Sequence, residues 1–264
     1  MRTRRIIYTL VFLAVSIPLL LRWTARVQPS PPVEMAYQAI EALQPGDLVL
    51  VGVDFGPSTM PEMNPMYEAI LEHLFRKGAK VAILSLQSAL DLPNGVQVLE
   101  KVARRHNKVY GEDYANLGYK PGLEAVIVSI GQEIRDVFPE DALGNPLDSL
   151  PMFQNVHNYD DIALIIDLAS GGTYGSWIQF AQARYGAKLI TGVTAVMGPE
   201  TYPYIQSKQL VGMLAGLKGA AEYETLIQRP GLGSRGMPAQ AMVHILIILM
   251  ILYGNWRFWE RWQR

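Results

Sequence analysis

The chain has 264 residues and no cysteine, which excludes disulfides, cysteine nucleophiles, and zinc or iron–sulfur sites built on thiolates. Its formal net charge is −1 at pH 7, but the first 26 and last 28 residues hold eight of the 23 basic residues and only one of the 24 acidic residues. The middle of the chain therefore has a net charge of about −8, which argues against a nucleic-acid partner because such a domain repels phosphate.

The chain begins with an apolar segment, residues 6–21, that contains no charged residue. Its length approaches the roughly 20 residues that a helix needs to cross a hydrocarbon core. Residues 1–26 are therefore predicted to form an N-terminal transmembrane anchor. A cleaved signal peptide has the same basic start and apolar run, but no small-x-small cleavage site follows Leu21, which favours an uncleaved anchor.

The middle segment, residues 27–236, alternates short apolar runs with amphipathic stretches. Strands are predicted at 47–53, 79–86, 114–118, 162–168 and 187–193, helices at 34–43, 65–77, 96–110, 177–185 and 209–226, and either a strand or a helix start at 124–130. Continuous apolar strands between helices are typical of parallel sheets buried on both faces. The segment is predicted to be one α/β domain with a doubly wound, mostly parallel, Rossmann-like sheet. Residues 139–159, with three prolines, are predicted to be a loop or lid over one sheet edge.

A second apolar run at 239–253 predicts that residues 237–264 form a C-terminal transmembrane anchor. Arginines flank the outer end of each anchor: Arg2, Arg4 and Arg5 before the first, and Arg257, Arg261 and Arg264 after the second. Basic flanks stay in the cytoplasm. Both termini are therefore predicted to be cytoplasmic and the α/β domain extracytoplasmic, with the inner or plasma membrane as its location and the lipid bilayer as a partner.

Carboxylates, hydroxyls and glycines follow two of the predicted strands, and the carboxyl ends of parallel strands meet at one sheet edge. The candidate ligand-binding pocket consists of Asp54, Ser58, Thr59, Asp167, Ser170, Gly171, Gly172 and Thr173. Asp54 and Asp167 suit a divalent cation or an acid–base pair. Residues of these types also commonly cap helices and close turns. No phosphate-binding or nucleophile-elbow motif and no histidine cluster is present, so no catalytic residue, metal site or cofactor is assigned.

Small residues recur along the predicted helix 209–226. Gly212, Gly216 and Ala220 are spaced by four residues, so on one helix they would form a stripe that another backbone can approach closely. The stripe is a candidate subunit interface. The alternative is tight packing on the domain's own sheet.

Residues 204–224, the turn at 118–122 and the two flanking apolar helices together resemble a group of uncharacterised bacterial membrane-anchored proteins. The resemblance implies a membrane location. It implies no activity and no catalytic residue.

These patterns favour a non-enzymatic role as a binding, scaffolding or accessory subunit of a membrane complex, with a membrane-protein partner or a second copy of the chain. One alternative is a membrane-bound hydrolase or transferase that uses Asp54 and Asp167 with Ser58 or Ser170. A second alternative is a solute sensor in which residues 139–159 act as a lid.

Overall fold

The computed structural model describes residues 2–262. Within them, six strands form one sheet in the order β3-β2-β1-β4-β5-β6, and every neighbouring pair is parallel. The strands are β1 (Leu48–Asp54), β2 (Lys80–Ser85), β3 (Tyr114–Tyr119), β4 (Ile162–Ala169), β5 (Leu189–Val193) and β6 (Gly212–Ala215). This is the strand order of a doubly wound fold, so the predicted parallel α/β domain is confirmed.

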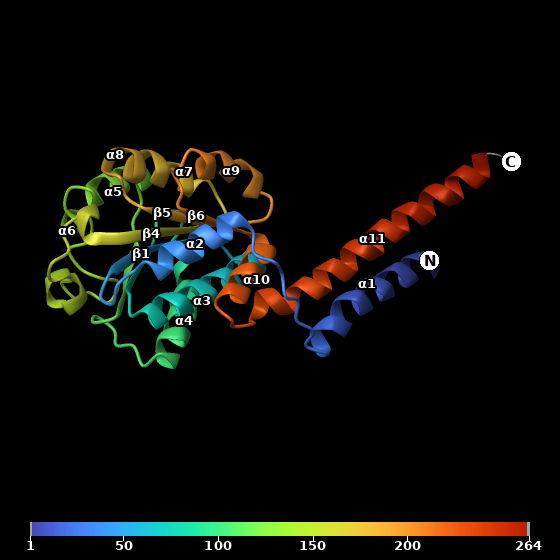
Figure 1. Ribbon diagram of the computed structural model, residues 1–264, viewed down its shortest axis with the longest axis horizontal. Helices are drawn as coiled ribbons and strands as arrows, with labels where there is room; N and C mark the ends of the chain where they lie inside the picture. The colour runs from blue at the N-terminus through green and yellow to red at the C-terminus, as the bar shows by residue number, and fades with distance from the viewer. Residues whose placement is uncertain (1, 263–264) are drawn as a thin grey trace.

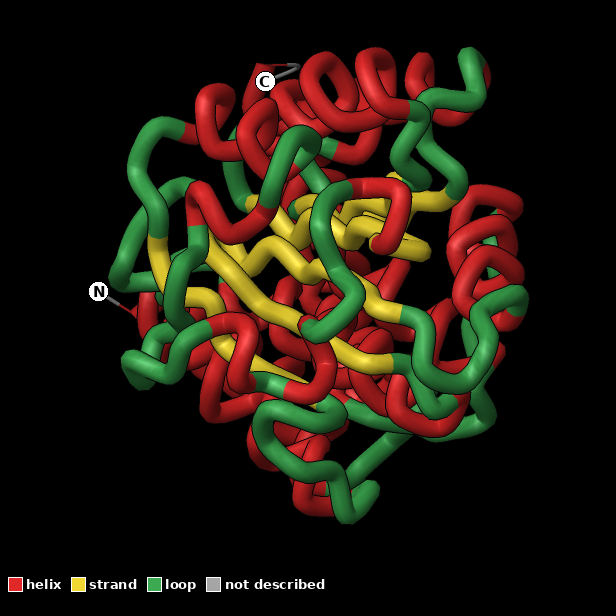
Figure 2. The backbone as a smooth tube through the Cα atoms, turned by 90° about the vertical axis from the view of Figure 1, so that its left-hand side faces the viewer, coloured by secondary structure: helices red, strands yellow, loops and turns green. Residues whose placement is uncertain are grey.

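Helices cover both faces of the sheet (Figure 1). One face carries α2 (Pro31–Glu41), α3 (Met60–Lys77), α4 (Leu92–Arg105) and α10 (Gly216–Leu226), whose apolar side chains share one hydrophobic core with the strands. The other face carries α5 (Leu123–Ile130), α6 (Ile134–Val137), α7 (Thr173–Trp177), the π-helical segment η4 (Ile178–Gln182), α8 (Ala183–Tyr185) and α9 (Gly198–Gln206), which build a second core. Figure 2 shows the strands crossing between the two layers. All seven residues of β1 are buried, which explains its unbroken apolar sequence.

Two further helices, α1 (Arg2–Leu20) and α11 (Leu232–Trp262), extend from one end of the α/β domain and lie side by side (Figure 1). Within residues 2–262, α11 is the one helix long and apolar enough to cross a membrane, over Leu232–Trp259. The predicted C-terminal anchor thus has a helix of suitable length and composition. The shorter α1 does not meet the same criterion in the described part of the chain.

Residues 139–159 form a loop along one edge of the sheet, as predicted, because the Ala142 N–H donates to the Asn116 carbonyl of the edge strand β3 at 2.8 Å. They contain the 3₁₀ turns η1 (Leu147–Ser149) and η2 (Pro151–Phe153), and η3 (Tyr159–Asp161) follows. Leu147, Met152 and Phe153 are buried in the second core. Pro151 and Met152 line the same surface groove as the first residues of β1 and β2, so the segment covers the amino ends of those strands.

The prediction of a single helix over 209–226 is wrong. Gly212–Ala215 is the edge strand β6, which pairs with β5, and α10 begins only at Gly216, where φ is +58°. Gly212, Gly216 and Ala220 therefore do not form a stripe on one helix. A Cβ on Gly212 would lie 2.3 Å from the Cα of Ala36, so Gly212 lets α2 approach the sheet closely. The small residues serve packing inside the domain.

Candidate functional site

Asp54 and Asp167 lie at the point where the strand order reverses, between β1 and β4. Asp54 ends β1, and Asp167 in β4 is in register with Gly52 of β1. Since residues two apart in a strand face the same side, both carboxyl groups lie on one face of the sheet. A Cβ on Gly52 would be 2.8 Å from Asp167 Oδ1 and 3.4 Å from Asp54 Oδ2, so the two side chains converge over the glycine.

The carboxyl group of Asp54 is bound on one side only. Its Oδ1 accepts hydrogen bonds from the Ser85 hydroxyl and from the backbone N–H groups of Leu86 and Gln87, each at 2.8 Å. These donors come from the turn after β2, the strand next to β1. The other oxygen, Oδ2, is buried and has no hydrogen-bond partner.

The carboxyl group of Asp167 has the same one-sided arrangement. Its Oδ2 accepts a hydrogen bond from the Thr173 hydroxyl at 2.9 Å, and its Oδ1 is buried without a partner. The indole of Trp177 lies near Asp167 but its N–H makes no hydrogen bond of good geometry. The two unpaired carboxyl oxygens are thus the pair that converges over Gly52.

Asp91 is a third buried carboxyl group at this edge, and the sequence analysis missed it. It immediately precedes α4, and its Oδ2 has no hydrogen-bond partner. Burial, and then the negative charge of Asp54, raises the pKa of Asp91. The signal that could have found it is an acidic residue in the turn after β2, because that turn opens beside the carboxyl end of β1.

The pair of Asp54 and Asp167 favours binding a proton. Burial raises the pKa of Asp54, although the hydrogen bonds from Gln87, Ser85 and Leu86 oppose the change. Burial, and then the negative charge of Asp54, raises the pKa of Asp167 well above its usual range. Two adjacent buried carboxyl groups titrate as one coupled unit. Such a pair is suited to acid–base chemistry.

A divalent cation at Asp54 and Asp167 remains a hypothesis. Residues 2–262 contain no group of three or more acidic or histidine side chains arranged to hold a metal ion. Two carboxylate oxygens alone are fewer than the six to eight ligands that calcium takes. A cation here would depend on backbone oxygens or water for the rest of its ligands.

The remaining predicted pocket residues divide into two groups. Thr173 contacts Asp167, the Ser170 N–H donates to the backbone oxygen of Asp54 at 3.0 Å, and Gly171 lies against the side chain of Gln87. Gly172 is exposed and precedes α7. Ser58 is exposed on the turn before α3, and the Thr59 hydroxyl donates to the Gly56 carbonyl at 3.1 Å. The Thr59 hydroxyl therefore closes the turn before α3 and makes no hydrogen bond that caps the helix.

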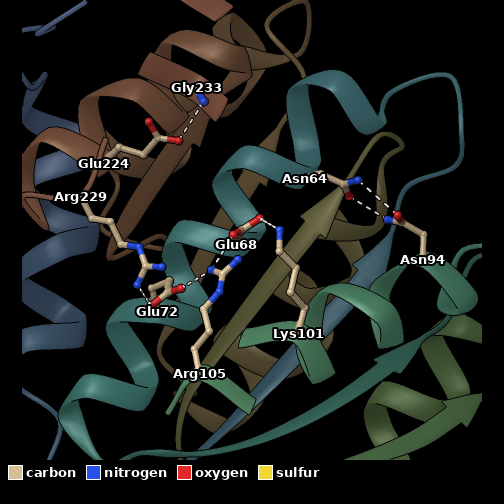
Figure 3. Close-up of polar contacts among 9 residues, drawn as sticks. All are labelled: Asn64, Glu68, Glu72, Asn94, Lys101, Arg105, Glu224, Arg229 and Gly233. Atoms are coloured by element: carbon tan, nitrogen blue, oxygen red, sulfur yellow. Dashed lines mark hydrogen bonds and ion pairs between the residues drawn. The ribbon is translucent and has the colours of Figure 1, made fainter. Parts of the chain in front are cut away.

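A second set of buried carboxylates lies where α1 and α11 join the domain. Glu224 of α10 accepts hydrogen bonds from the backbone N–H groups of Gly231, Gly233 and Ser234 at 2.7–2.8 Å, and from the Ser234 hydroxyl at 2.6 Å. Figure 3 shows the bond to Gly233. These N–H groups belong to the first turn of α11 and the residue before it, where a helix has donors without internal partners. Glu224 thus caps α11 with a charge that also suits the helix dipole.

Glu222, two residues earlier, binds the other end of the chain. It accepts hydrogen bonds from the Ser30 hydroxyl at 2.6 Å and the Ser30 N–H at 3.2 Å, and it pairs with Lys218. Ser30 ends the linker from α1 and precedes α2. The Ala25 N–H also donates to the Ser234 carbonyl at 2.9 Å. We call Ser30, Glu222, Glu224 and Ser234 the anchor junction.

An ion-pair network supports the turn between α10 and α11 (Figure 3). Glu72 of α3 is buried and contacts Arg105 and His106, each at 2.6 Å, and Arg229 in that turn. Glu68 holds Lys101 at 2.9 Å and Arg105 at 2.7 Å. The buried Glu72 thereby links α3 to α4 and to the turn before α11, and removal of its cation partners would leave a buried charge uncompensated.

The chain was also compared with known proteins. No protein-family model matches it, and the search of curated proteins finds no similar sequence.

Proposed function

We propose that this protein is a non-enzymatic accessory subunit of a membrane complex, in which α1 and α11 cross the bilayer as a hairpin and the acidic α/β domain binds a partner. The observation that carries the proposal is the anchor junction. A single turn of α10 holds the linker from α1 through Glu222 and the start of α11 through Glu224. The domain is thereby held in one orientation relative to both helices.

The packing of α1 on α11 supports the hairpin. The buried or half-buried residues of α11 include Ala239, Val243, Leu246 and Met250, and those of α1 include Ile7, Val11, Ala14 and Pro18. Their spacings alternate between three and four residues, which is the pattern of two helices packed nearly antiparallel or parallel. Ala239 and Ala14 are small enough for close approach of the two backbones in lipid. We call the four α11 residues the α11 seam.

The direction of the sheet also supports a partner in the same membrane. The strands run toward the end of the domain from which α11 leaves (Figure 1). Ser30 of the anchor junction lines a 240 Å³ groove together with Ala195 and Gly198, which follow the carboxyl end of β5. The edge that carries Asp54 and Asp167 therefore faces the membrane side. A domain held rigidly with its ligand-binding edge toward the bilayer suits recognition of a membrane-embedded partner.

The proposed location is the inner or plasma membrane, with both termini in the cytoplasm and the α/β domain outside, as the terminal arginines predict. The resemblance to bacterial membrane-anchored proteins implies the same location. Protease added to intact cells should digest the domain. A domain that is cut only after the cytosolic face is opened would overturn this topology.

The test of the accessory role is chemical cross-linking of the full-length chain in its native membrane, followed by purification and identification of cross-linked proteins. We expect one membrane protein in near-stoichiometric yield. The double variant Glu222→Gln, Glu224→Gln should lower that yield, because it loosens the domain without changing its outer surface. Exposed Glu200→Gln is the matched control and should leave the yield unchanged. A chain that cross-links to no other protein overturns the proposal.

The convergent carboxyl pair favours a second candidate, a membrane-bound hydrolase or transferase that uses Asp54 and Asp167 as acid and base. The unpaired oxygens at the strand-order reversal are the specific observation behind it. Both residues have no exposed surface, so a substrate would reach them only after the surrounding loops move. Turnover by the purified full-length chain that Asp54→Asn and Asp167→Asn each abolish would establish this candidate in place of the accessory role.

A further inference from the structure

The helix α11 carries polar side chains on a face that α1 leaves open. Gln240, His244 and Asn255 are separated by four and then eleven residues, and both spacings are close to a whole number of helical turns. All three are exposed, whereas the α11 seam turns toward α1. Ile248 and Ile251, each 56% exposed, lie between His244 and Asn255 on the same side. We call these five residues the polar face of α11.

Lipid is a poor environment for this face. His244 lies within the apolar run of α11, and Gln240 and Asn255 lie near its two ends. Hydrocarbon offers no hydrogen bonds, so amide and imidazole groups that point into it lose the bonds they make in water. Polar residues inside membranes almost always face another helix or a water-filled cavity. A further transmembrane helix that covered the polar face would supply hydrogen-bond partners that lipid lacks.

We infer that the polar face of α11 binds the same face of a second copy of this chain, which gives a two-fold symmetric dimer within the membrane. The inference rests on the proposed insertion of α11. All copies insert in the same direction, so Gln240, His244 and Asn255 of two copies lie at equal depths. Glutamine, asparagine and neutral histidine each carry both a donor and an acceptor, so identical residues satisfy one another across the axis. A helix from another protein would need matching polar groups at all three depths.

Cross-linking through single cysteines tests the geometry. The chain has no cysteine, so each substitution introduces the only thiol. Ile248→Cys and Ile251→Cys place it on the polar face. Leu249→Cys is the matched control, because Leu249 is 57% exposed and lies between them in depth but points to another side of the helix. Oxidation of the full-length variants in membranes should give covalent dimers at 248 and 251 in several-fold higher yield than at 249. Equal yields at the three positions, or no dimer at any, overturn the inference.

A second experiment tests the hydrogen bonds. The variants Gln240→Leu and His244→Leu keep α11 apolar and should remain in the membrane after carbonate extraction. Energy transfer between labelled full-length chains, diluted stepwise with lipid, should show about three- to twenty-fold weaker dimerisation for each variant. Unchanged dimerisation overturns the inference.

Two other outcomes separate the inference from the proposed function. If Ile248→Cys cross-links to a different membrane protein and not to itself, the dimer is wrong while the accessory role stands. If carbonate removes the wild-type chain from the membrane, both are wrong.

Discussion

The substitution Glu224→Gln tests the anchor junction most directly. The carboxylate of Glu224 accepts four hydrogen bonds, three of them at Oε2 and one, from the Gly233 N–H, at Oε1. A glutamine of the same shape has one acceptor oxygen and one NH₂ group. The lowest-cost orientation keeps the oxygen at the three donors, so that the NH₂ group faces the Gly233 N–H and that donor loses its acceptor.

The expected magnitude follows from this loss. A buried donor left without a partner costs about 1–3 kcal/mol, and a tenfold change in an equilibrium corresponds to about 1.4 kcal/mol. The first turn of α11 should therefore open about 5- to 150-fold more often. Loss of the negative charge at the helix N-terminus acts in the same direction.

Hydrogen exchange of the full-length protein in lipid nanodiscs measures this opening. Peptides that contain Gly231–Ser234 should exchange faster in Glu224→Gln by the factor given above, while peptides from β1 and β4 stay unchanged. Glu222→Gln should instead accelerate exchange around Ser30, because Glu222 binds that residue. Exposed Glu200→Gln should change neither. Unchanged exchange at Gly231–Ser234 in Glu224→Gln would refute the idea that this carboxylate holds α11 to the domain.

Three further predictions concern the α/β domain. The pKa of Asp167 is raised in the folded protein, so its contribution to stability is present below its unfolded pKa and lost as pH rises through the folded pKa. In urea unfolding, the free energy of unfolding of Asp167→Asn should rise relative to that of the wild type as pH increases above the unfolded pKa of about 3.9, and a pH-independent difference would contradict this. Burial lowers the pKa of His73, so its contribution is present above the unfolded pKa near 6.5 and lost as pH falls below it. Below pH 6.5, the free energy of unfolding of His73→Gln should change less with pH than that of the wild type. An NMR titration that places the folded pKa of His73 above 6.5 would reject the argument. Gly212→Ala forces a Cβ into the backbone of Ala36 and should destabilise by about 1–3 kcal/mol in urea unfolding. Gly172→Ala, with nothing within 4 Å, is its control, and equal effects of the two variants would show that the close approach does not matter.

The strands could be predicted well where both sheet faces are covered. Apart from Asp54 and Asp167, β1 and β4 have apolar sequences because helices bury them on both sides. The four-residue β6 could not be separated from the helix that follows it, since a short apolar run is compatible with either structure. Pairing with β5 and the contact of Gly212 with α2 decide the strand, and both involve residues far away in the sequence.

The candidate site was predictable in position but not in chemistry. Asp54 and Asp167 were expected to meet because parallel strands end at one edge, and the structure does bring them together over Gly52. Their raised pKa values depend on burial and, for Asp167, on the nearby charge of Asp54, neither of which the sequence reveals. The same holds for Asp91, whose carboxyl group belongs to the candidate site only because β2 lies beside β1.

Local composition alone determined the apolar helices at both ends, the acidic middle and the alternation of strands and helices, because each depends on residues close together in the chain. Only the tertiary structure decided which side chains hold the parts together. Glu222 binds Ser30 across 192 residues, while Glu224, two positions later, caps α11. In the sequence both are ordinary acidic residues of a helix. Their role arises because folding buries them beside hydrogen-bond donors from distant parts of the chain.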